Sequence, residues 1–415
     1  MIPQGSANRE VREMKKVVIT GLGAVTALGN NVQDYWNALI EGKSGMRTIT
    51  RVPAENHDTT VAAEVDDSFE QEASKYWKKR MLSATTKAVR MGLASAGEAI
   101  EDCGADFASL DRSRIGIIYG LADNTYEGVE LENKSHITLK RMQSEIPAMI
   151  AIKHNITGPS FNMSTACASS GYAMALGKHL IQSGLCDMII VGGLSYVVND
   201  AVLDGFNQLL AMSVNPDPNK ASRPFTKNRD GFIMGEGGGT VVLESEEHAR
   251  SREAKIYCEL AGASISCEAS SLTAPQADGA GMAYSMRCAL EDAGITPDEV
   301  GYINAHGTST TLNDLYETMA IKQIFGEKAY DIPVSSIKAA IGHTLAGCGV
   351  IEAIACVKAI EEGILPPTVH FDEPDPELDL NYIPNSALKK DINVAVSNAF
   401  GFGGHDATLV FRKYN

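Results

Sequence analysis

Residues 99–104 read Ala-Ile-Glu-Asp-Cys-Gly, and residues 289–294 repeat them as Ala-Leu-Glu-Asp-Ala-Gly. Each copy is followed by a short polar turn and an apolar run, at residues 115–120 and 300–305. The pattern predicts a helix that ends at its glycine and leads into a buried strand. The spacing of about 190 residues is too long for a solenoid repeat and indicates a duplicated half.

A second pair of similar segments supports the duplication. Residues 160–184 and 333–363 each read as a strand, a turn and an apolar helix. Short continuous apolar runs, such as residues 188–191, alternate with helical patterns, which is typical of sheets covered by helices on both faces. We therefore expect an α/β fold of two duplicated halves that share one core. The N-terminal half would cover residues 14–255 and the C-terminal half residues 256–415.

The bulk properties exclude several classes of protein. The formal net charge of −16 argues against a nucleic-acid partner, because phosphate contacts need clustered basic residues. The eight cysteines include no C-x-x-C pair, so neither a zinc site nor a disulfide scaffold is indicated, and a reducing cytoplasm fits best. Residues 1–13 lack the apolar core of a secretory signal and are expected to be a disordered leader or tag remnant. No apolar run is long enough to span a membrane.

Cys167 is the first candidate for chemistry. It lies in Asn162-Met-Ser-Thr-Ala-Cys-Ala-Ser-Ser-Gly171, just before an apolar helical pattern at residues 173–181. Unpaired amide groups and the helix dipole at such a turn favour a thiolate, and the small neighbours let a substrate approach the sulfur. A single cysteine at a helix start is more often a buried structural residue, so this stretch alone does not decide the matter.

Two histidines follow the strands of the C-terminal half. His306 lies in Asn304-Ala-His-Gly-Thr-Ser-Thr310, on a turn that glycine permits, and His343 ends the stretch 335–343, which also holds Lys338. Each histidine alone is more often a packed or capping residue. Two at strand-to-helix turns of a duplicated fold, with a cysteine at a third such turn, favour a catalytic set.

A glycine-alternating loop stands near the end of the chain, Ser397-Asn-Ala-Phe-Gly-Phe-Gly-Gly404. Its backbone can approach a substrate closely, and its amides are candidates for an oxyanion hole. The same glycines are equally typical of a tight hairpin.

In this order, the motifs resemble those of the β-ketoacyl-acyl-carrier-protein synthases, the type II condensing enzymes of the thiolase-like superfamily, and in particular the synthase II-like members. The resemblance covers nearly the whole chain and implies a thiolase-like fold, with two duplicated α/β halves in a layered αβαβα arrangement. The matching segments are residues 17–23, 221–225, 229–237, 273–275 and 278–279, followed by the HGTST, IGH and GFGG stretches.

The resemblance implies an acyltransferase with a Cys-His-His site. Cys167 would accept an acyl chain from a carrier protein as a thioester. His306 and His343 would hold the malonyl thioester, promote loss of CO₂ and stabilise the enolate that attacks the acyl-enzyme. The product would be a β-ketoacyl-acyl-carrier protein in fatty acid or type II polyketide biosynthesis.

Further residues match supporting positions of that family. By the resemblance, the amides of Cys167 and Phe402 form the oxyanion hole, and Phe400 with Phe402 gates the acyl pocket. Lys338 pairs with an acidic residue matching Glu317 and orients the site. The phosphopantetheine arm would be hydrogen-bonded by Thr308 and Thr310.

The implied partner is an acyl carrier protein, which brings the phosphopantetheine arm, so neither a metal nor another cofactor is expected. Because carrier proteins are acidic, an acidic enzyme needs a basic landing site. Lys78, Lys79 and Arg80 are the best candidates by composition, although a solvated helix face explains them equally well. The chain is expected to form a homodimer or a heterodimer with a chain-length factor.

Several positions depart from the family's usual wording. Thr226 replaces an aspartate, Thr311 replaces a proline, and His405-Asp406 stands where Thr-Asn or His-Asn is common. The stretch 122–147 is shorter than in housekeeping synthases, by roughly a dozen residues as judged from the resemblance. These differences leave acyl chain length and pathway open and make a specialised pathway a serious alternative.

Three other readings compete. Thiolases share the fold but use a second cysteine as base, which the C-terminal loop lacks, and synthases primed by coenzyme A use asparagine where His343 stands. A chain-length-factor-like scaffold would be non-catalytic and would lack the nucleophilic cysteine, whereas Cys167 is present.

Overall fold

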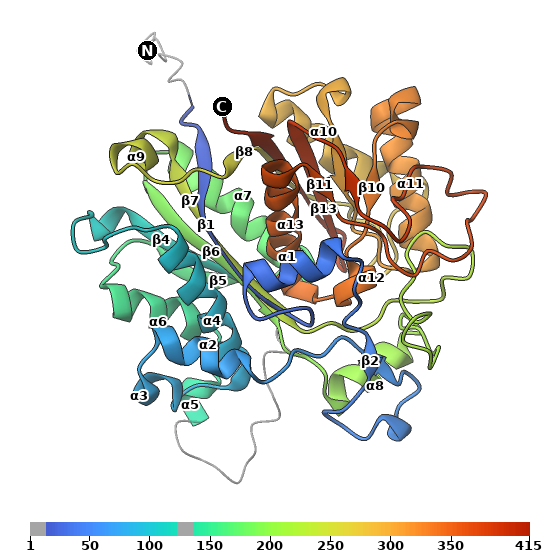
Figure 1. Ribbon diagram of the computed structural model, residues 1–415, viewed down its shortest axis with the longest axis horizontal. Helices are drawn as coiled ribbons and strands as arrows, with labels where there is room; N and C mark the ends of the chain where they lie inside the picture. Colours follow the sequence, from blue (N-terminus) through green and yellow to red (C-terminus); the bar gives the residue numbers. More distant parts are fainter. Residues whose placement is uncertain (1–13, 123–136) are drawn as a thin grey trace, which may run out of the picture.

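The computed structural model describes residues 14–122 and 137–415 (Figure 1). The expected leader at residues 1–13, and residues 123–136 of the stretch expected to be shortened, lie outside this part of the chain. The main sheet of the described chain has ten strands in the order β10-β9-β13-β14-β8-β1-β7-β6-β4-β5. These strands are β1 (Val17–Thr26), β4 (Ile115–Leu121), β5 (Ser160–Met163), β6 (Met188–Ser195), β7 (Gly237–Ser245), β8 (Cys258–Cys267), β9 (Tyr302–Asn304), β10 (Val334–Ser335), β13 (Val394–Gly401) and β14 (His405–Lys413).

The strand order confirms the predicted duplication. From the centre outwards, one half runs β1-β7-β6-β4-β5 and the other β8-β14-β13-β9-β10. In each half the first two pairings are antiparallel and the last two are parallel. The halves meet where β1 pairs with β8, through Val18 opposite Glu259 and Ile19 opposite Cys258. Two small sheets join β2 (Arg47–Thr48) to β3 (Val61–Ala62) and β11 (Ile364–Leu365) to β12 (Leu388–Lys389).

The helices complete five layers, as the resemblance implied. α4 covers the outer face of the first half, α10 covers that of the second half, and α7 and α13 lie between the two (Figure 1). The α-helices are α1 (Val32–Ile40), α2 (Phe69–Tyr76), α3 (Lys79–Leu82), α4 (Lys87–Asp102), α5 (Ile137–Lys140), α6 (Glu145–His154), α7 (Ser169–Gln182), α8 (Asp200–Gln208), α9 (Glu246–Ser251), α10 (Ala280–Ala293), α11 (Thr311–Phe325), α12 (Lys338–Ile341) and α13 (Cys348–Glu362).

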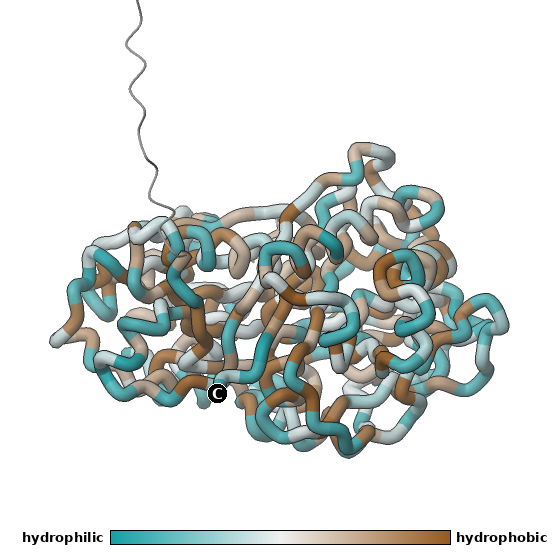
Figure 2. Tube along the Cα trace, turned by 90° about the horizontal axis from the view of Figure 1, so that it is seen from above, coloured by the Kyte–Doolittle hydropathy of each residue, from teal (hydrophilic) through white to brown (hydrophobic). Residues whose placement is uncertain are grey.

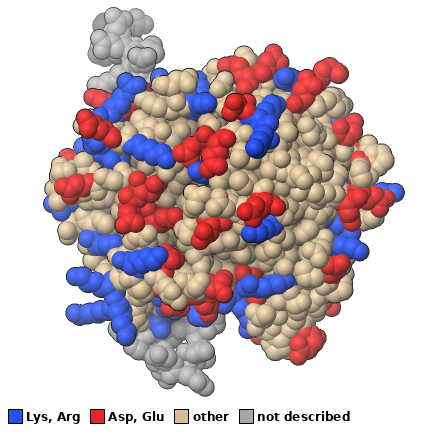
Figure 3. Space-filling model, viewed as in Figure 1, with Lys and Arg blue, Asp and Glu red and all other residues tan. Residues whose placement is uncertain are grey.

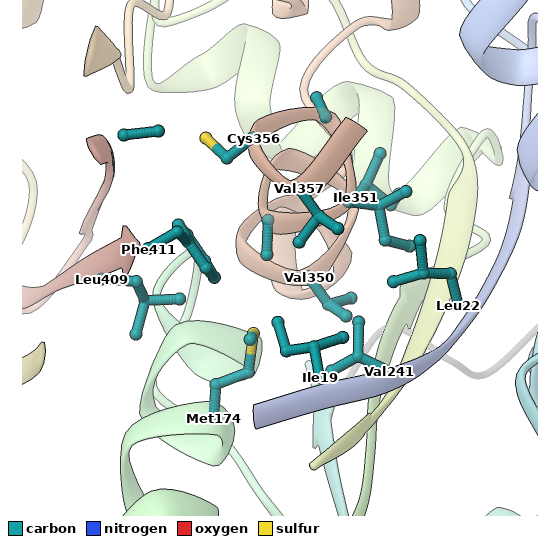
Figure 4. Close-up of a cluster of buried hydrophobic side chains, with 14 of the residues drawn as sticks. Ile19, Leu22, Met174, Val241, Val350, Ile351, Cys356, Val357, Leu409 and Phe411 are labelled. Carbon is teal, nitrogen blue, oxygen red and sulfur yellow. The ribbon is translucent and has the colours of Figure 1, made fainter. Parts of the chain in front are cut away.

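The central core surrounds α13. Its residues 348–360 are all buried, and Val350, Ile351 and Val357 point towards side chains of α7, β1, β7 and β14 (Figure 4). A helix that is apolar on every side is stable only when neighbours cover every side, which the two halves of the sheet and α7 do here. Separate apolar clusters lie under α4 and under α10. In Figure 2, many turns at the edge of the molecule are coloured as hydrophilic.

The close layering depends on small residues. A Cβ on Gly23 of β1 would lie 2.0 Å from the carbonyl oxygen of Ser95 in α4, so only glycine lets this helix rest on the strand. Within the described residues, no helix combines the length and apolar character needed to cross a bilayer.

Candidate active site

Cys167 lies on a tight turn between β5 and α7, as the sequence predicts. Ala166 adopts the left-handed region with φ of 49°, which points the chain sharply towards the helix. The Ser169 hydroxyl accepts from the amide of Thr165 at 2.9 Å and donates to the carbonyl of Ala166 at 2.7 Å. These bonds fix the backbone on both sides of Cys167, whose side chain is buried.

The thiol of Cys167 is more basic than the sequence suggested. Burial raises its pKa to about 11, and the opposing effects of the Lys338 charge and of the amides of Phe402 and Cys167 are smaller. The two amides lower the pKa of Cys167 in the expected direction, but removal of the sulfur from water has the larger effect. The amides of Phe402 and Cys167 therefore both lie close to the sulfur.

His306 follows β9 and is held from two sides. Its amide and that of Gly307 each donate to the Glu317 carboxylate at 2.8 Å, which fixes the turn. Its ring Nδ1 lies 3.2 Å from Nζ of Lys338. Because an ammonium group can only donate, Nδ1 accepts and the ring proton is on Nε2. Burial, followed by the charges of Lys338 and His343, lowers the pKa of His306 well below its usual value, so the ring is neutral.

His343 reaches the same state by a different route. Its Nδ1 accepts from the amide of Leu345 at 3.2 Å, so its proton is also on Nε2. Burial, followed by the Lys338 charge, lowers its pKa well below the usual value. The rings of His306 and His343 meet edge to face, with centroids 5.2 Å apart. The site therefore holds two neutral imidazoles whose free donors are both Nε2–H groups.

The partner of Lys338 differs from the one expected. Lys338 forms its ion pair with Glu352 of α13, whereas Glu317 accepts from the amides of His306 and Gly307. Burial raises the pKa of Glu352 to about 7, against the opposing effect of Lys338. A signal for Glu352 was present in the sequence, because it is an acidic residue within an apolar helical run.

Cys348 is a second thiol that the sequence did not assign to the site. Its Sγ donates to the carbonyl oxygen of Cys167 at 3.1 Å. In the described part of the chain, potential ligand atoms of Cys348, His306 and Glu352 lie within 4.8 Å of one another, a spacing that could hold a metal ion. The ammonium of Lys338 bonds to two of the three groups and already supplies positive charge there.

One pocket of about 420 Å³ brings Cys167 together with both histidines, whereas Lys338, Glu317, Glu352 and Cys348 lie behind its wall. It is lined by the cysteine, both histidines and the other predicted site residues Thr308, Thr310, Phe400 and Phe402. The hydroxyls of Thr308 and Thr310 are hydrogen-bonded to each other at 2.9 Å. Phe402 packs against Phe206 of α8 with ring centroids 6.2 Å apart, and Phe400 packs against His306 at 5.9 Å. Both phenylalanines thus form part of the wall of the pocket that contains Cys167.

The basic residues predicted for docking lie elsewhere. Lys78, Lys79 and Arg80 are exposed around the start of α3, and none of them lines the pocket. They form no ion pair with any residue that the structure describes. Lys and Arg side chains gather at the lower left of Figure 3, where α3 lies in Figure 1.

Comparisons with known proteins agree over most of the chain. Residues 14–249 match the family described as beta-ketoacyl synthase, N-terminal domain, and residues 257–372 match its C-terminal domain. A Synechocystis protein named 3-oxoacyl-[acyl-carrier-protein] synthase 2 is 41% identical, over 97% of this chain and 99% of its own.

Two solved structures are also similar. One is a type II polyketide synthase ketosynthase in complex with its acyl-carrier protein and bound to the hexaketide, with a TM-score of 0.84 and 32% identity. The other is the ishigamide ketosynthase/chain length factor, with a TM-score of 0.87 and 30% identity. Each similarity covers 97% of this chain and 100% of the other chain.

Proposed function

This chain belongs to the beta-ketoacyl synthase family, and from that premise we propose that it joins a malonyl unit to a cysteine-bound acyl chain by decarboxylative Claisen condensation. The product is a β-ketoacyl-acyl-carrier protein. The observation that carries the proposal is the convergence of Cys167 with two neutral histidines, His306 and His343, in one pocket. The phosphopantetheine arm comes with the carrier protein, so the enzyme uses no cofactor of its own.

In the first step Cys167 takes the acyl group. Its sulfur attacks the thioester carbonyl of the acyl-carrier protein, the bond from that carbonyl to the carrier's sulfur breaks, and the thiol proton leaves with the carrier's sulfur. The amides of Cys167 and Phe402 stabilise the negative oxygen of the intermediate, and their approach to the sulfur supports this role.

In the second step the histidines act on the malonyl thioester. The Nε2–H groups of His306 and His343 donate to its carbonyl oxygen while the bond to the carboxylate breaks and CO₂ leaves. The enolate carbon then attacks the acyl-Cys167 carbonyl, the bond from that carbonyl to the sulfur breaks as the new carbon–carbon bond forms, and the departing thiolate takes up one proton from water to restore the thiol. In a buried pocket, hydrogen bonds from neutral donors become stronger as the negative charge of the enolate develops. A fixed positive charge would also stabilise the carboxylate of the reactant, and neutral imidazoles avoid that effect.

The remaining predicted residues have supporting roles in this proposal. Lys338 fixes the tautomer of His306, and Glu317 fixes its backbone. Thr308 and Thr310 hydrogen-bond the phosphopantetheine arm, and their position on the pocket wall supports this role. Phe400 and Phe402 gate the acyl pocket.

The carrier protein docks on Lys78, Lys79 and Arg80. These side chains are exposed and unpaired among the described residues, which leaves them available for acidic groups of a partner. The carrier named with the ketosynthase similar to this chain supports the class of partner.

The chain acts as a dimer, either with a second copy or with a chain-length factor. The edge strand β5 leaves one side of its backbone unpaired within the described chain, which supports further pairing there. The ketosynthase/chain length factor among the similar structures supports the heterodimer, and the synthase 2 relative supports a fatty acid pathway.

The cellular location and the division of the chain are also proposals. A cytoplasmic location is supported by eight free cysteines. A boundary between the halves near residues 255 and 256 is supported by its place between α9 and β8.

Intact-protein mass spectrometry tests the function directly. The chain is mixed with carrier proteins that bear acyl groups from acetyl to long-chain, and then with malonyl-carrier protein. We expect the mass of one acyl group on Cys167, followed by a product two carbons longer. Acylation that appears only after a second subunit is added supports the heterodimer. Its absence with every carrier and with both partners overturns the proposal.

A further inference from the structure

Two acidic residues, Asp406 and Glu268, lie close together beside the hairpin that carries Phe402. Asp406 of β14 pairs with Ser266 of β8, so Glu268, two residues further along, lies on the same face as a diagonal neighbour. Both acidic residues line the pocket. The side chain of Asp406 is buried, and neither its Oδ2 nor Oε1 of Glu268 has a hydrogen-bond partner among the described residues.

Among the described residues that line the pocket, no lysine or arginine offsets these charges. The titratable groups that face Asp406 are Glu268 and Cys267 from the end of β8, Tyr172 from α7 and His405 from its own strand. Burial, and then the Glu268 charge, raises the pKa of Asp406 to about 8, and burial raises the pKa of Glu268. Near neutral pH the two groups therefore keep at least one proton between them.

Asp406 and Glu268 lie next to the backbone hydrogen bonds that hold the hairpin in place. The amide of Glu268 donates to the carbonyl of Gly404 at 2.8 Å, and the amide of Gly403 donates to that of Leu272 at 2.8 Å. The hairpin rests directly on the nucleophile turn, because a Cβ on Gly401 would lie 3.2 Å from the amide nitrogen of Cys167. The position of the Phe402 amide relative to the sulfur therefore depends on these contacts.

We propose that Asp406 and Glu268 are positioning residues that hold the 400–404 hairpin over Cys167 while they keep a proton between them, and release it when both ionise. The two like charges then repel across an interface held by two backbone hydrogen bonds. The effect of hairpin opening on the condensation rests on the proposed function. The opening of the hairpin itself does not, because it is a property of the folded chain.

The direction of the pH effect follows from linkage. The closed hairpin raises the pKa of Asp406 from its usual value near 3.8 to about 8. The proton on Asp406 therefore stabilises the closed hairpin fully below about pH 3.8. This stabilisation decreases as the pH rises and is completely lost above about pH 8. The opening constant can rise by at most about tenfold per pH unit in that window.

Hydrogen exchange tests the pair. The exchange protection of two peptides, one containing the Gly403 amide and one containing the Glu268 amide, is measured between pH 6 and 9.5 in the wild type, Asp406→Asn and Glu268→Gln, with the exposed Asp298→Asn as the matched control. We expect the wild-type opening constant, divided by that of Asp406→Asn, to rise between pH 6 and 8 and stay level above. Glu268→Gln makes the rise smaller without abolishing it, because burial of Asp406 remains, and Asp298→Asn does not change it.

A ratio that stays constant with pH, as a purely structural role of Asp406 gives, overturns the proposal, and so does an unchanged rise in Glu268→Gln. Acyl transfer is measured on the same samples. If no acyl group reaches Cys167 at any pH, the proposed function fails while the exchange result still decides the role of the pair.

Discussion

The ammonium of Lys338 lies 3.2 Å from Nδ1 of His306 and at the same time pairs with Glu352, so one buried lysine fixes the tautomer of a ring 32 residues away. Without this donor, the proton could move to Nδ1 and the Nε2–H group would be lost from the pocket. The histidine depends on the lysine for the orientation of its donor, and the lysine depends on the glutamate for its charge.

Replacing Lys338 with Met should separate these effects. The substitution leaves Glu352 buried and unpaired, which costs about 3–5 kcal/mol of unfolding free energy. The double variant Lys338→Met with Glu352→Gln should recover most of that stability but not the decarboxylation rate, because Nδ1 of His306 still lacks its donor. Denaturant unfolding and CO₂ release measure the two quantities. Full recovery of the rate in the double variant would contradict this assignment.

The two histidines should be needed for decarboxylation and not for acyl transfer. We expect His306→Ala or His343→Ala to lower CO₂ release from malonyl-carrier protein by about 10²–10³-fold each, the usual effect of removing one donor to a developing oxyanion. The mass of the acyl group on Cys167 should still appear. Equal loss of both steps would argue that the histidines serve only the structure of the pocket.

The two thiols at the site should behave differently. Cys167→Ala should abolish the acyl mass, because the nucleophile is gone. Cys348→Ala removes only the bond to the Cys167 carbonyl, worth about 1 kcal/mol, so acylation should fall by less than about tenfold. Rates from stopped reactions analysed by mass spectrometry compare the two variants. Acyl mass on Cys348 in place of Cys167 would reverse their roles.

Gly342 should be intolerant of a side chain. Its φ is 71°, and a Cβ would lie 2.7 Å from Cα of Gly235, a backbone atom that cannot turn away. Strain and clash together predict that Gly342→Ala loses at least about 3 kcal/mol of unfolding free energy. Gly294 is the matched control, since its φ is 61° and no atom lies within 4 Å of a Cβ there. Gly294→Ala should cost about 1–2 kcal/mol. Similar losses in both variants would refute the clash.

His57 should make stability depend on pH. Burial alone would lower its pKa, but hydrogen bonds to Asp204 at 2.8 Å and Asp200 at 3.0 Å outweigh burial and raise it. The stabilisation is complete below the usual value of 6.5 and is lost as pH rises through the raised one. The difference in unfolding free energy between the wild type and His57→Gln should therefore shrink above neutral pH. An NMR titration of His57 with a midpoint below 6.5 would show that burial dominates.

The arrangement of the fold could be predicted from the sequence because its signals are local. The repeat at residues 99–104 and 289–294 lies in α4 and α10, which the structure places on equivalent strands of the two halves. Cys167 and His306 follow strands, whereas His343 follows the short helix α12, and all three line one pocket, so short motifs were sufficient to choose them. Periodicity and turn residues act within a few positions of the chain, and the sequence by itself determined these features.

The protonation states of the site residues and the partners of their charged side chains were decided only by the tertiary structure. Glu352 rather than Glu317 reaches Lys338 because α13 is buried between the two halves of the sheet, and no local pattern contains that distance. The pKa of Cys167 rises to about 11, and Asp406 meets Glu268, because each depends on which groups are removed from water together. Burial and charge pairing are properties of the packed chain, since desolvation acts on every group that the folded neighbours cover.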